Sequence, residues 1–232
     1  MRFAVVRFGG SNCDLDAVHV LRHVLGVETD LLWYKEGLGR GYDAVVIPGG
    51  FSYGDYLRAG AIAARTPVME EILRHAKDGG LVLGICNGAQ IGAESRLVPG
   101  TFTLNAYPKF LCRPVHLRVE NNATPFTSLY REGEVIRIPI AHKEGRYMAD
   151  PETLAALGRE KRVVFRFCDP EGRITDGANA NGSMENITGV HGKGGNFLAM
   201  MPHPERASEE VLGSEDGKRV FLSMIRHIEE AG

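Results

Sequence analysis

The feature that most constrains the fold is a series of short, continuously apolar segments in the first third of the chain. They span residues 2–8, 27–33, 43–48 and 81–85. Runs this short and this apolar are typical of strands that are buried on both faces of a parallel sheet. Helical sequence patterns lie between them, which indicates right-handed strand–helix–strand units. We therefore expect an α/β fold with a mostly parallel central sheet and helices on both faces.

The helical segments carry recognisable signals of their own. Residues 15–25 place leucine or valine at a spacing close to 3.6 residues. Residues 67–80 begin with Pro67, which suits a first helical turn, and Gly79 suits the end of that helix. A last helix is expected from Asp216 to Glu230, with apolar residues along one face.

The second half of the chain has a different pattern, because apolar and polar residues alternate there. Alternation with a period of two is typical of strands with one covered face, as in antiparallel sheets. The segments concerned are residues 113–120, 134–140, 161–169, 186–192 and 195–205. We expect these additional antiparallel strands to join the main sheet. The chain has no repeats or linkers, so residues 1–232 are interpreted as a single domain.

Composition excludes several classes of function. The formal net charge of −2 gives no electrostatic footprint for nucleic acid or for an anionic membrane surface. The longest apolar runs are about six residues, far short of the ~20 that span a bilayer. The N-terminal segment is interpreted as a first strand, not as a signal peptide.

The cysteines indicate where the protein works. Cys13, Cys86, Cys112 and Cys168 lie far apart and form no C-x-x-C pair, which argues against a zinc site and against a disulfide scaffold. A reduced, cytoplasmic setting is therefore expected.

The segment LVLGICNGAQIGAE, residues 81–94, places Cys86 between Gly84 and Gly88 where a strand gives way to a helix. A nucleophile flanked in this way sits on a sharp turn, and the glycines let neighbouring backbone pass close by. The unpaired N–H groups of the helix that begins near Asn87 would favour a thiolate. The alternative is a buried, inert cysteine that fills the core, and the segment alone does not decide between the two.

A second segment, MPHPER, supplies candidates for the partners that a nucleophilic cysteine needs. His203 precedes Pro204, which favours extended geometry, and in extended backbone residues i and i+2 project to the same side. Glu205 could therefore hold the imidazole of His203 in one tautomer. The alternative is a surface turn that follows a strand.

A third segment, IPGGFSYGDYLRAG at residues 47–60, follows a strand and opens with two glycines. A loop that aims backbone N–H groups at an oxyanion would have this composition. A mobile glycine-rich loop is the alternative. A phosphate-binding loop is less favoured, because the chain contains no G-x-x-x-x-G-K-[ST] pattern.

Taken in order, these segments resemble the class I glutamine amidotransferases. The resemblance is carried by VVRFGGSNCD, GGFSYGDYLRAG, GICNGAQ, KFLCRPVHLRVENNATPFT, IAHKEGRY, NGSMENITGV and MPHPER. Within the class it is closest to glutaminase subunits that serve a synthetase of purine biosynthesis. The resemblance implies a flavodoxin-like fold and a catalytic triad of Cys86, His203 and Glu205.

The resemblance also implies how glutamine is bound and cleaved. Cys86 would attack the γ-carboxamide to form a thioester, and His203 would carry protons. Backbone N–H groups near Gly50 or Phe51, and at Asn87, would stabilise the oxyanion. Gln90 matches a family position that lines the glutamine pocket; the alternative is an exposed helix residue. No metal site is expected.

Two positions depart from the family pattern. Ala89 stands where a large aromatic residue is expected, which leaves the packing beside Cys86 open. Lys143 stands where a glycine is usual. The roles of His142 and Glu144 are therefore open: they lie at the glutamine pocket, at a partner face, or at a polar strand end.

The implied partners follow from what the chain lacks. No residues remain after the last helix for an ATP-using domain, and ammonia released into water would be protonated and unreactive. We expect glutamine as the substrate, no cofactor in this chain, and docking onto a large synthetase that uses ATP and Mg²⁺. The resemblance also suggests a small third subunit. The competing hypotheses are a cysteine hydrolase or redox sensor that ignores glutamine, and a non-catalytic binding subunit.

Overall fold

The fold is built from eleven strands and five α-helices in the part of the chain described by the computed structural model, residues 1–231. The strands are β1 (Arg2–Arg7), β2 (Glu28–Trp33), β3 (Ala44–Ile47), β4 (Leu81–Ile85), β5 (Thr101–Thr103), β6 (Leu111–Val119), β7 (Val135–His142), β8 (Arg146–Met148), β9 (Val163–Cys168), β10 (Ile187–His191) and β11 (Phe197–Met200). The helices are α1 (Asp14–His19), α2 (Pro67–Lys77), α3 (Asn87–Glu94), α4 (Pro151–Arg159) and α5 (Lys218–Ala231).

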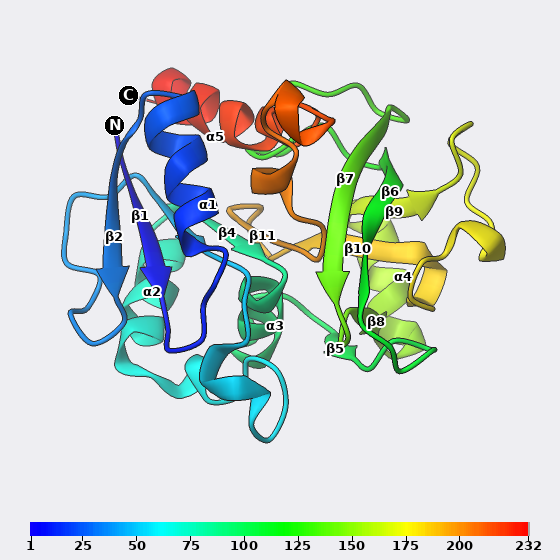
Figure 1. Cartoon of the computed structure of the whole chain (residues 1–232), viewed down its shortest axis with the longest axis horizontal. Coiled ribbons are helices and arrows are strands. Elements are labelled where there is room, and N and C mark those ends of the chain that lie inside the picture. Colours follow the sequence, from blue (N-terminus) through cyan, green and yellow to red (C-terminus); the bar gives the residue numbers. More distant parts are fainter. Residues whose placement is uncertain (232) are drawn as a thin grey trace.

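Nine of these strands form one sheet, in the order β2-β1-β3-β4-β11-β10-β9-β6-β7 (Figure 1). The pairs from β2 to β11 are parallel, and the remaining pairs are antiparallel. The parallel part has the 2-1-3-4-5 order of a flavodoxin-like sheet. The expected α/β fold, with antiparallel strands joined to a parallel sheet, is confirmed. Strands β5 and β8 form a separate two-stranded sheet.

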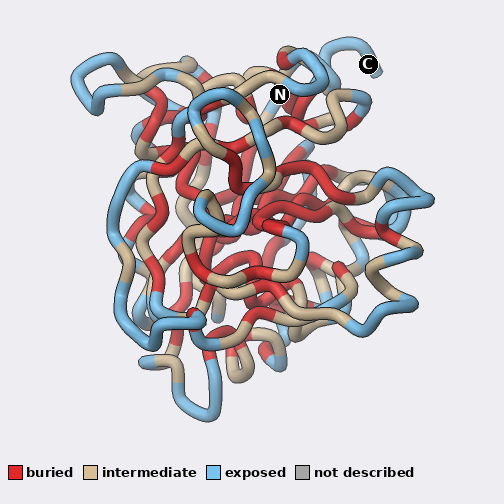
Figure 2. Tube along the Cα trace, turned by 90° about the vertical axis from the view of Figure 1, so that its right-hand side faces the viewer, coloured by how far each residue is buried: buried red, intermediate tan, exposed pale blue. Residues whose placement is uncertain are grey.

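The hydrophobic core contains the apolar segments that were predicted to be buried strands. Every residue of β3, β4 and β11 is buried, and the buried positions run through the interior while exposed positions lie on peripheral loops (Figure 2). Each large aliphatic side chain buried in this way contributes about 1.5–3 kcal/mol. Helix α1 packs against β1 and β2, and α3 packs against β4 and β11. The strand ends that carry the site are thereby held on a rigid platform.

Several boundaries differ from the sequence-based expectations. The helix after β1 continues as a π-helix at Val20–Val24. The strand expected over residues 195–205 ends at Met200, because Pro202 and Pro204 have no N–H for a ladder and the chain turns there. Helix α4 was not predicted; its N-cap is Asp150, whose carboxylate accepts the N–H of Thr153.

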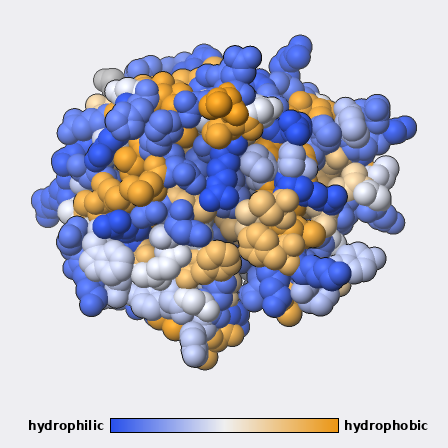
Figure 3. All heavy atoms as spheres, in the orientation of Figure 1, coloured by the Kyte–Doolittle hydropathy of each residue, from blue (hydrophilic) through white to orange (hydrophobic). Residues whose placement is uncertain are grey.

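Neither the visible surface nor the helices of residues 1–231 suggest contact with a membrane interior. On the face shown in Figure 3, hydrophobic side chains lie in separate groups among hydrophilic ones. Among residues 1–231 no helix has the length and apolar composition needed to cross a bilayer.

The carboxyl ends of β1, β3, β4 and β11 lie at the same edge of the sheet, because these strands are parallel. The strand order reverses between β1 and β3, and open α/β sheets bind their ligands at such a point. The loops that follow these two strands are joined there by a bridge between Ser11 and Gly50.

Candidate active site

Cys86 occupies a strained turn between β4 and α3. Its backbone lies at φ 50° and ψ −103°, a region that side chains with a Cβ seldom adopt. Strain of this kind costs about 1–3 kcal/mol and persists where the surroundings enforce it. Here the N–H of Cys86 donates to the carbonyl of Met200, while Ala89 N–H and Gln90 N–H donate to the carbonyl of Cys86. The turn therefore presents the sulfur at the start of α3.

The two flanking glycines are required by close backbone contacts. A Cβ at Gly84 would lie 2.6 Å from the carbonyl oxygen of Gly88, and a Cβ at Gly88 would lie 2.0 Å from that of Ile47. Both approaches are shorter than any normal contact, so the tight strand–turn–helix junction excludes larger residues. Ala89 is completely buried at this junction.

His203 and Glu205 meet as the sequence suggested, although the backbone between them is different. His203 is extended, but Pro204–Arg206 form a 3₁₀ turn. The Nδ1 of His203 and the Oε1 of Glu205 are 2.6 Å apart, and the two residues are only 1% and 2% exposed. The N–H of His203 donates to the carbonyl of Pro139 on β7. His203 is therefore held by β7 at its backbone and by Glu205 at its ring.

The charge state of His203 results from opposing effects. Burial lowers the pKa of His203, but the carboxylate of Glu205 and the nearby thiols of Cys86 and Cys13 raise it, and the net pKa lies well above the usual value. An imidazolium beside Cys86 can give a proton to a leaving group. The fold thus brings Cys86 together with His203 and Glu205, although Cys86 lies far from both in sequence.

The glycine-rich loop after β3 lies beside the cysteine. A Cβ at Gly49 would be 3.4 Å from the Cβ of Cys86 and 2.7 Å from the His203 ring. Gly50 has φ 150°, and a Cβ there would lie 2.6 Å from Ser11 Cα. The N–H of Phe51 donates to the carbonyl of Gly10 at 2.9 Å. That bond occupies the Phe51 donor and leaves Gly50 as the better-placed loop residue for an oxyanion hole.

Asn87 and Gln90 connect the elbow to the surrounding loops. The Oδ1 of Asn87 accepts the N–H of Ser52, and its Nδ2 donates to the Oε1 of Gln90. The Nε2 of Gln90 donates to the carbonyl of Glu144 at 2.5 Å. Both residues are buried, so Gln90 is not an exposed helix residue. Their side chains fix the loop after β3 and the segment after β7 relative to Cys86.

A cavity of about 120 Å³ opens in front of Cys86. Its walls come from the elbow, the glycine-rich loop and the end of β7. The residues that line it are Gly50, Phe51, Asp55, Cys86, Gln90, Phe110, Ala141, His142, Lys143 and Glu144. The thiol of Cys86 points toward the β7 side, where its Sγ donates to the carbonyl of Ala141 at 3.6 Å.

Residues 142–144, whose role the sequence left open, line this cavity. His142 is buried, and burial together with the charge of His203 lowers its pKa to about 3, so its ring is neutral. Its Nδ1 pairs with the Oδ1 of Asn105 at 3.1 Å. That oxygen also accepts the N–H of Gly145. Asn105 therefore fixes the wall that His142, Lys143 and Glu144 form.

Three further residues of the site were missed by the sequence reasoning. Asp55 lines the cavity, and burial plus the charge of Glu144 raise its pKa to about 6. Cys13, in the loop after β1, contacts His203, and Arg206 Nη2 donates to its Sγ at 3.1 Å. Arg206 stands next to the predicted glutamate, so its position was a usable signal. Cys13 and Asp55 lie in segments that carry the resemblance, but nothing in those segments singled them out.

Among residues 1–231 the cluster of Cys13, His203 and Glu205 comes nearest to a metal site, with its ligand atoms within 4.8 Å of one another. It does not fit one ion, because Glu205 engages the Nδ1 of His203 at 2.6 Å and Arg206 lies against the cluster. The arrangement as a whole is suited to acyl transfer. It combines a thiol at a helix start, an imidazole held by a carboxylate, and backbone N–H groups beside a small cavity.

Comparison with known proteins gives one consistent family. The sequence matches the CobB/CobQ-like glutamine amidotransferase domain over residues 1–221. It is 57% identical over 230 residues to the phosphoribosylformylglycinamidine synthase subunit PurQ of Methanosarcina acetivorans, covering 99% of each chain. It is 53% identical over 228 residues to the subunit of the same name from Symbiobacterium thermophilum, covering 98% of this chain and 97% of that one.

The structure also superimposes on a solved one. PurLQS from Thermotoga maritima contains a chain that matches with a TM-score of 0.87 at 44% identity, and 98% of each chain is covered. The likeness therefore extends through both the parallel and the antiparallel parts of the sheet.

Proposed function

The chain belongs to the CobB/CobQ-like glutamine amidotransferase family, and from that premise we propose that it is the glutaminase subunit of a phosphoribosylformylglycinamidine synthase. In this role it releases ammonia from glutamine for the conversion of formylglycinamide ribonucleotide to formylglycinamidine ribonucleotide. Residues 1–232 act as one glutamine amidotransferase domain. The observation that supports catalysis most directly is the strained Cys86 facing the buried His203–Glu205 pair.

The reaction begins at the thiolate of Cys86, which attacks the γ-carboxamide carbon of glutamine. The oxyanion that forms is stabilised by the N–H groups of Gly50 and Asn87; one such donor is typically worth about 10²–10³ in turnover. The imidazolium of His203 gives its proton to the departing nitrogen, which leaves as ammonia, and a γ-glutamyl thioester remains. Glu205 keeps the imidazole oriented throughout.

The second half-reaction regenerates the enzyme. His203, now neutral, takes a proton from water as the water oxygen attacks the thioester carbon. The carbon–sulfur bond breaks, glutamate leaves, and Cys86 returns with its proton shared with His203. No metal or organic cofactor of this chain takes part in these steps.

Substrate recognition uses the charges at the cavity. Glutamine carries an α-ammonium group, and Asp55 and Glu144 place negative charge on one side of the cavity. Burial and the like charge of Glu144 raise the pKa of Asp55, and a bound cation would offset both effects. We assign the α-ammonium to this side. Gln90 and Phe51 then serve as walls for the side chain of the substrate.

The partners follow from the family. The ammonia passes to a large synthetase subunit that uses ATP and Mg²⁺, and a small third subunit completes the complex. PurLQS of Thermotoga maritima is one solved structure with a similar chain. Formation of a purine precursor from glutamine takes place in the cytoplasm, where the free thiol of Cys86 stays reduced.

The test combines activity with labelling. Glutamine hydrolysis is measured for the chain alone and with its synthetase subunit, and hydrolysis is expected to rise in the complex. A diazoketone analogue of glutamine should label Cys86, and glutamine should protect it. Labelling that glutamine does not slow would instead indicate a cysteine hydrolase with another substrate. Cys112, a free and exposed cysteine, serves as the matched control through Cys112→Ala.

A further inference from the structure

Two adjoining cavities meet at the active site. The first, the glutamine cavity of about 120 Å³, has Cys86 in its lining. The second cavity, of about 60 Å³, has His203 in its lining. The walls that the two cavities share are Gly50, Phe51, Phe110 and Ala141. The nucleophile and the group that carries protons therefore stand at different cavities, with a common partition between them.

The orientation of His203 determines where ammonia forms. Glu205 engages the Nδ1 of His203 at 2.6 Å, so the proton for the departing nitrogen comes from Nε2. This Nε2 is buried and makes no hydrogen bond within residues 1–231. When the carbon–nitrogen bond of the carboxamide breaks, the proton moves to the nitrogen, and neutral ammonia forms beside the imidazole. Ammonia is thus released on the side of the site that borders the second cavity.

The glutamine cavity is closed to ammonia at that moment. The γ-glutamyl group stays bound to Cys86 as a thioester until water attacks it, and it occupies the cavity through which glutamine entered. The carboxylates of Asp55 and Glu144 also line this cavity, and nearby negative charge favours the protonated form, ammonium. Because ammonium is not a nucleophile, a product that is to be used needs another way out.

The second cavity has the size and the charge that suit neutral ammonia. One water, a molecule of similar size, needs about 10–15 Å³ of such a volume. Among residues 1–231 no carboxylate belongs to its lining, and its permanent charge is the guanidinium of Arg206. Arg206 is held in place by Asp16, 3.2 Å from its Nε, and by the Sγ of Cys13, 3.1 Å from its Nη2. A cation in the wall disfavours a second cation, so ammonia stays unprotonated there.

The second cavity reaches the surface at a rim that includes Asn12 and two aromatic rings. Asn12 is exposed, and the rings of Phe51 and Phe110 are 42% and 48% exposed. The centroids of the two rings are 6.2 Å apart. Neighbouring apolar side chains on a surface favour burial against another protein. A partner that covers this rim would receive ammonia before it meets bulk water.

We propose that the second cavity is the ammonia exit of this chain, and that the synthetase subunit docks over its rim at Asn12, Phe51 and Phe110. Glutamine enters and glutamate leaves by the glutamine cavity, whereas ammonia leaves past Cys13 and Arg206. The separate exit lets ammonia move on while the thioester still blocks the entrance. This inference rests on the proposed glutaminase function and names the path of its product.

Asn12 offers the first test, because its exposed side chain lines the second cavity. Asn12→Trp fills the exit, whereas the matched control Asn12→Ala leaves it open. In the complex with the synthetase, formation of formylglycinamidine ribonucleotide from glutamine should fall at least about tenfold in Asn12→Trp. Formation of the same product from added ammonium chloride, which bypasses this chain, should be unchanged. Asn12→Ala should match the wild type with both nitrogen sources.

Labelling separates the exit from the entrance. The diazoketone analogue of glutamine reaches Cys86 through the glutamine cavity and yields dinitrogen, not ammonia, so its reaction does not need the exit. Asn12→Trp should therefore be labelled at the wild-type rate. An equal loss of labelling and of product formation would overturn the proposal, because the second cavity would then be the entrance. Product formation from glutamine at the wild-type rate in Asn12→Trp would overturn it as well.

A second variant keeps the exit testable if Asn12→Trp fails to fold or to dock. Phe110→Ala opens the rim, so ammonia should leak into solvent, and the product formed per glutamate released should fall by about twofold or more. This ratio corrects for any change in hydrolysis itself. Leu212→Ala, at another exposed apolar side chain, should keep the ratio of the wild type. No glutamine hydrolysis by the wild-type complex would contradict the proposed function, whereas hydrolysis with an unchanged ratio in Phe110→Ala would contradict only the exit.

Discussion

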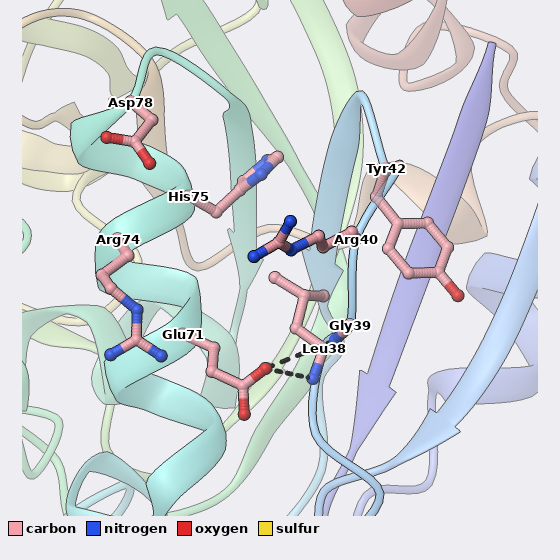
Figure 4. A pocket seen from close by; sticks show the side chains of 9 residues that line it. Leu38, Gly39, Arg40, Tyr42, Glu71, Arg74, His75 and Asp78 are labelled. Atoms are coloured by element: carbon pink, nitrogen blue, oxygen red, sulfur yellow. Dashed lines mark hydrogen bonds between the residues drawn. The ribbon is translucent and has the colours of Figure 1, made fainter.

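Two hollows of this molecule differ in both size and chemistry. The larger, of about 590 Å³, lies between α2 and the connection from β2 to β3 (Figure 4). There the carboxylate of Glu71 accepts the N–H groups of Leu38 and Gly39, and Arg74 is exposed. Burial lowers the pKa of His75, but no nucleophile stands near it in the lining of the hollow.

The smaller hollow, of about 120 Å³, holds the reactive groups. Cys86 is strained, His203 is buried with a raised pKa, and Asp55 has a pKa of about 6. The contrast shows that volume is a poor guide to the active site of this protein. Backbone strain, buried polar atoms and shifted pKa values in one place are the better guide. Each lowers the stability of the folded protein, so such features gather mainly where function requires them.

The largest effect is expected at Cys86. Cys86→Ala removes the nucleophile and should lower glutamine turnover by about 10⁴-fold or more. Turnover is measured by glutamate release in the complex, with folding checked by circular dichroism. Cys112→Ala should retain wild-type turnover. Residual hydrolysis near the wild-type rate in Cys86→Ala would mean that the smaller hollow is not the catalytic one.

The second-largest effect is expected for Glu205→Gln. Turnover should fall about 10²–10⁴-fold, because the carboxylate orients the ring of His203. The same carboxylate raises the pKa of His203, so its removal lowers that pKa. The imidazolium is then lost at lower pH, and the alkaline limb of the turnover profile shifts to lower pH. Glu210→Gln, at an exposed glutamate, is the control. An unshifted profile would argue against the pairing.

Gly50→Ala tests the oxyanion loop. The added Cβ would lie 2.6 Å from Ser11 Cα and 2.8 Å from Asn12 N, so the loop must move. Loss of one oxyanion donor predicts a fall of about 10²–10³ in kcat with a smaller change in KM. In Gly158→Ala the Cβ meets no atom within 4 Å, and turnover should stay normal. A changed KM with an unchanged kcat would remove Gly50 from the oxyanion hole.

Asp55→Asn tests the smaller hollow through the pH dependence of kcat/KM. Since the pKa of Asp55 is about 6, its carboxylate is charged above that pH and protonated below it. If it binds the α-ammonium of glutamine, kcat/KM of the wild type falls as pH drops through about 6. Asp55→Asn should lower kcat/KM by about tenfold at pH 8 and flatten that limb. Asp78→Asn, in the larger hollow, should leave the profile unchanged.

The smallest effect is expected in the larger hollow. Glu71→Ala removes the acceptor of two backbone N–H groups, at a cost of about 1 kcal/mol for a partly exposed carboxylate. This should lower Tm by about 2–4 °C in a protein of this size. Thermal unfolding and glutamine turnover are measured side by side. A loss of turnover as large as that of Asp55→Asn would show that the two hollows are coupled.

Much of the fold could be predicted from local sequence. The apolar segments became β1 to β4, and four of the alternating segments became the antiparallel strands β6, β7, β9 and β10. The fifth became β11, which was expected to be antiparallel but pairs parallel with β4 and antiparallel only with β10. Helix α4 was missed because only Leu157 on it is buried, although Asp150 and Pro151 are ordinary signals of a helix start. The end of β11 was placed too late, since the prolines that follow it were not weighed against the strand pattern.

The candidate site was predictable where a motif spans a few residues. The glycines around Cys86 and the two-residue spacing of His203 and Glu205 are local, and the structure shows the contacts expected of them. Cys13 is 190 residues from His203 in the chain, and no sequence pattern connects them. Asp55 is an ordinary loop aspartate until burial and Glu144 alter its pKa.

The amino-acid sequence by itself determined the strand content, the sharp turn at Cys86 and the order of the reactive residues, because these depend on sterics and hydrogen bonding between near neighbours. Only the tertiary structure decided that Cys13 lies against His203, that Phe51 N–H is taken by Gly10, and that Asp55 faces Glu144. Those relations depend on distances between separate loops, and the packing of parallel strands at one edge of the sheet sets those distances.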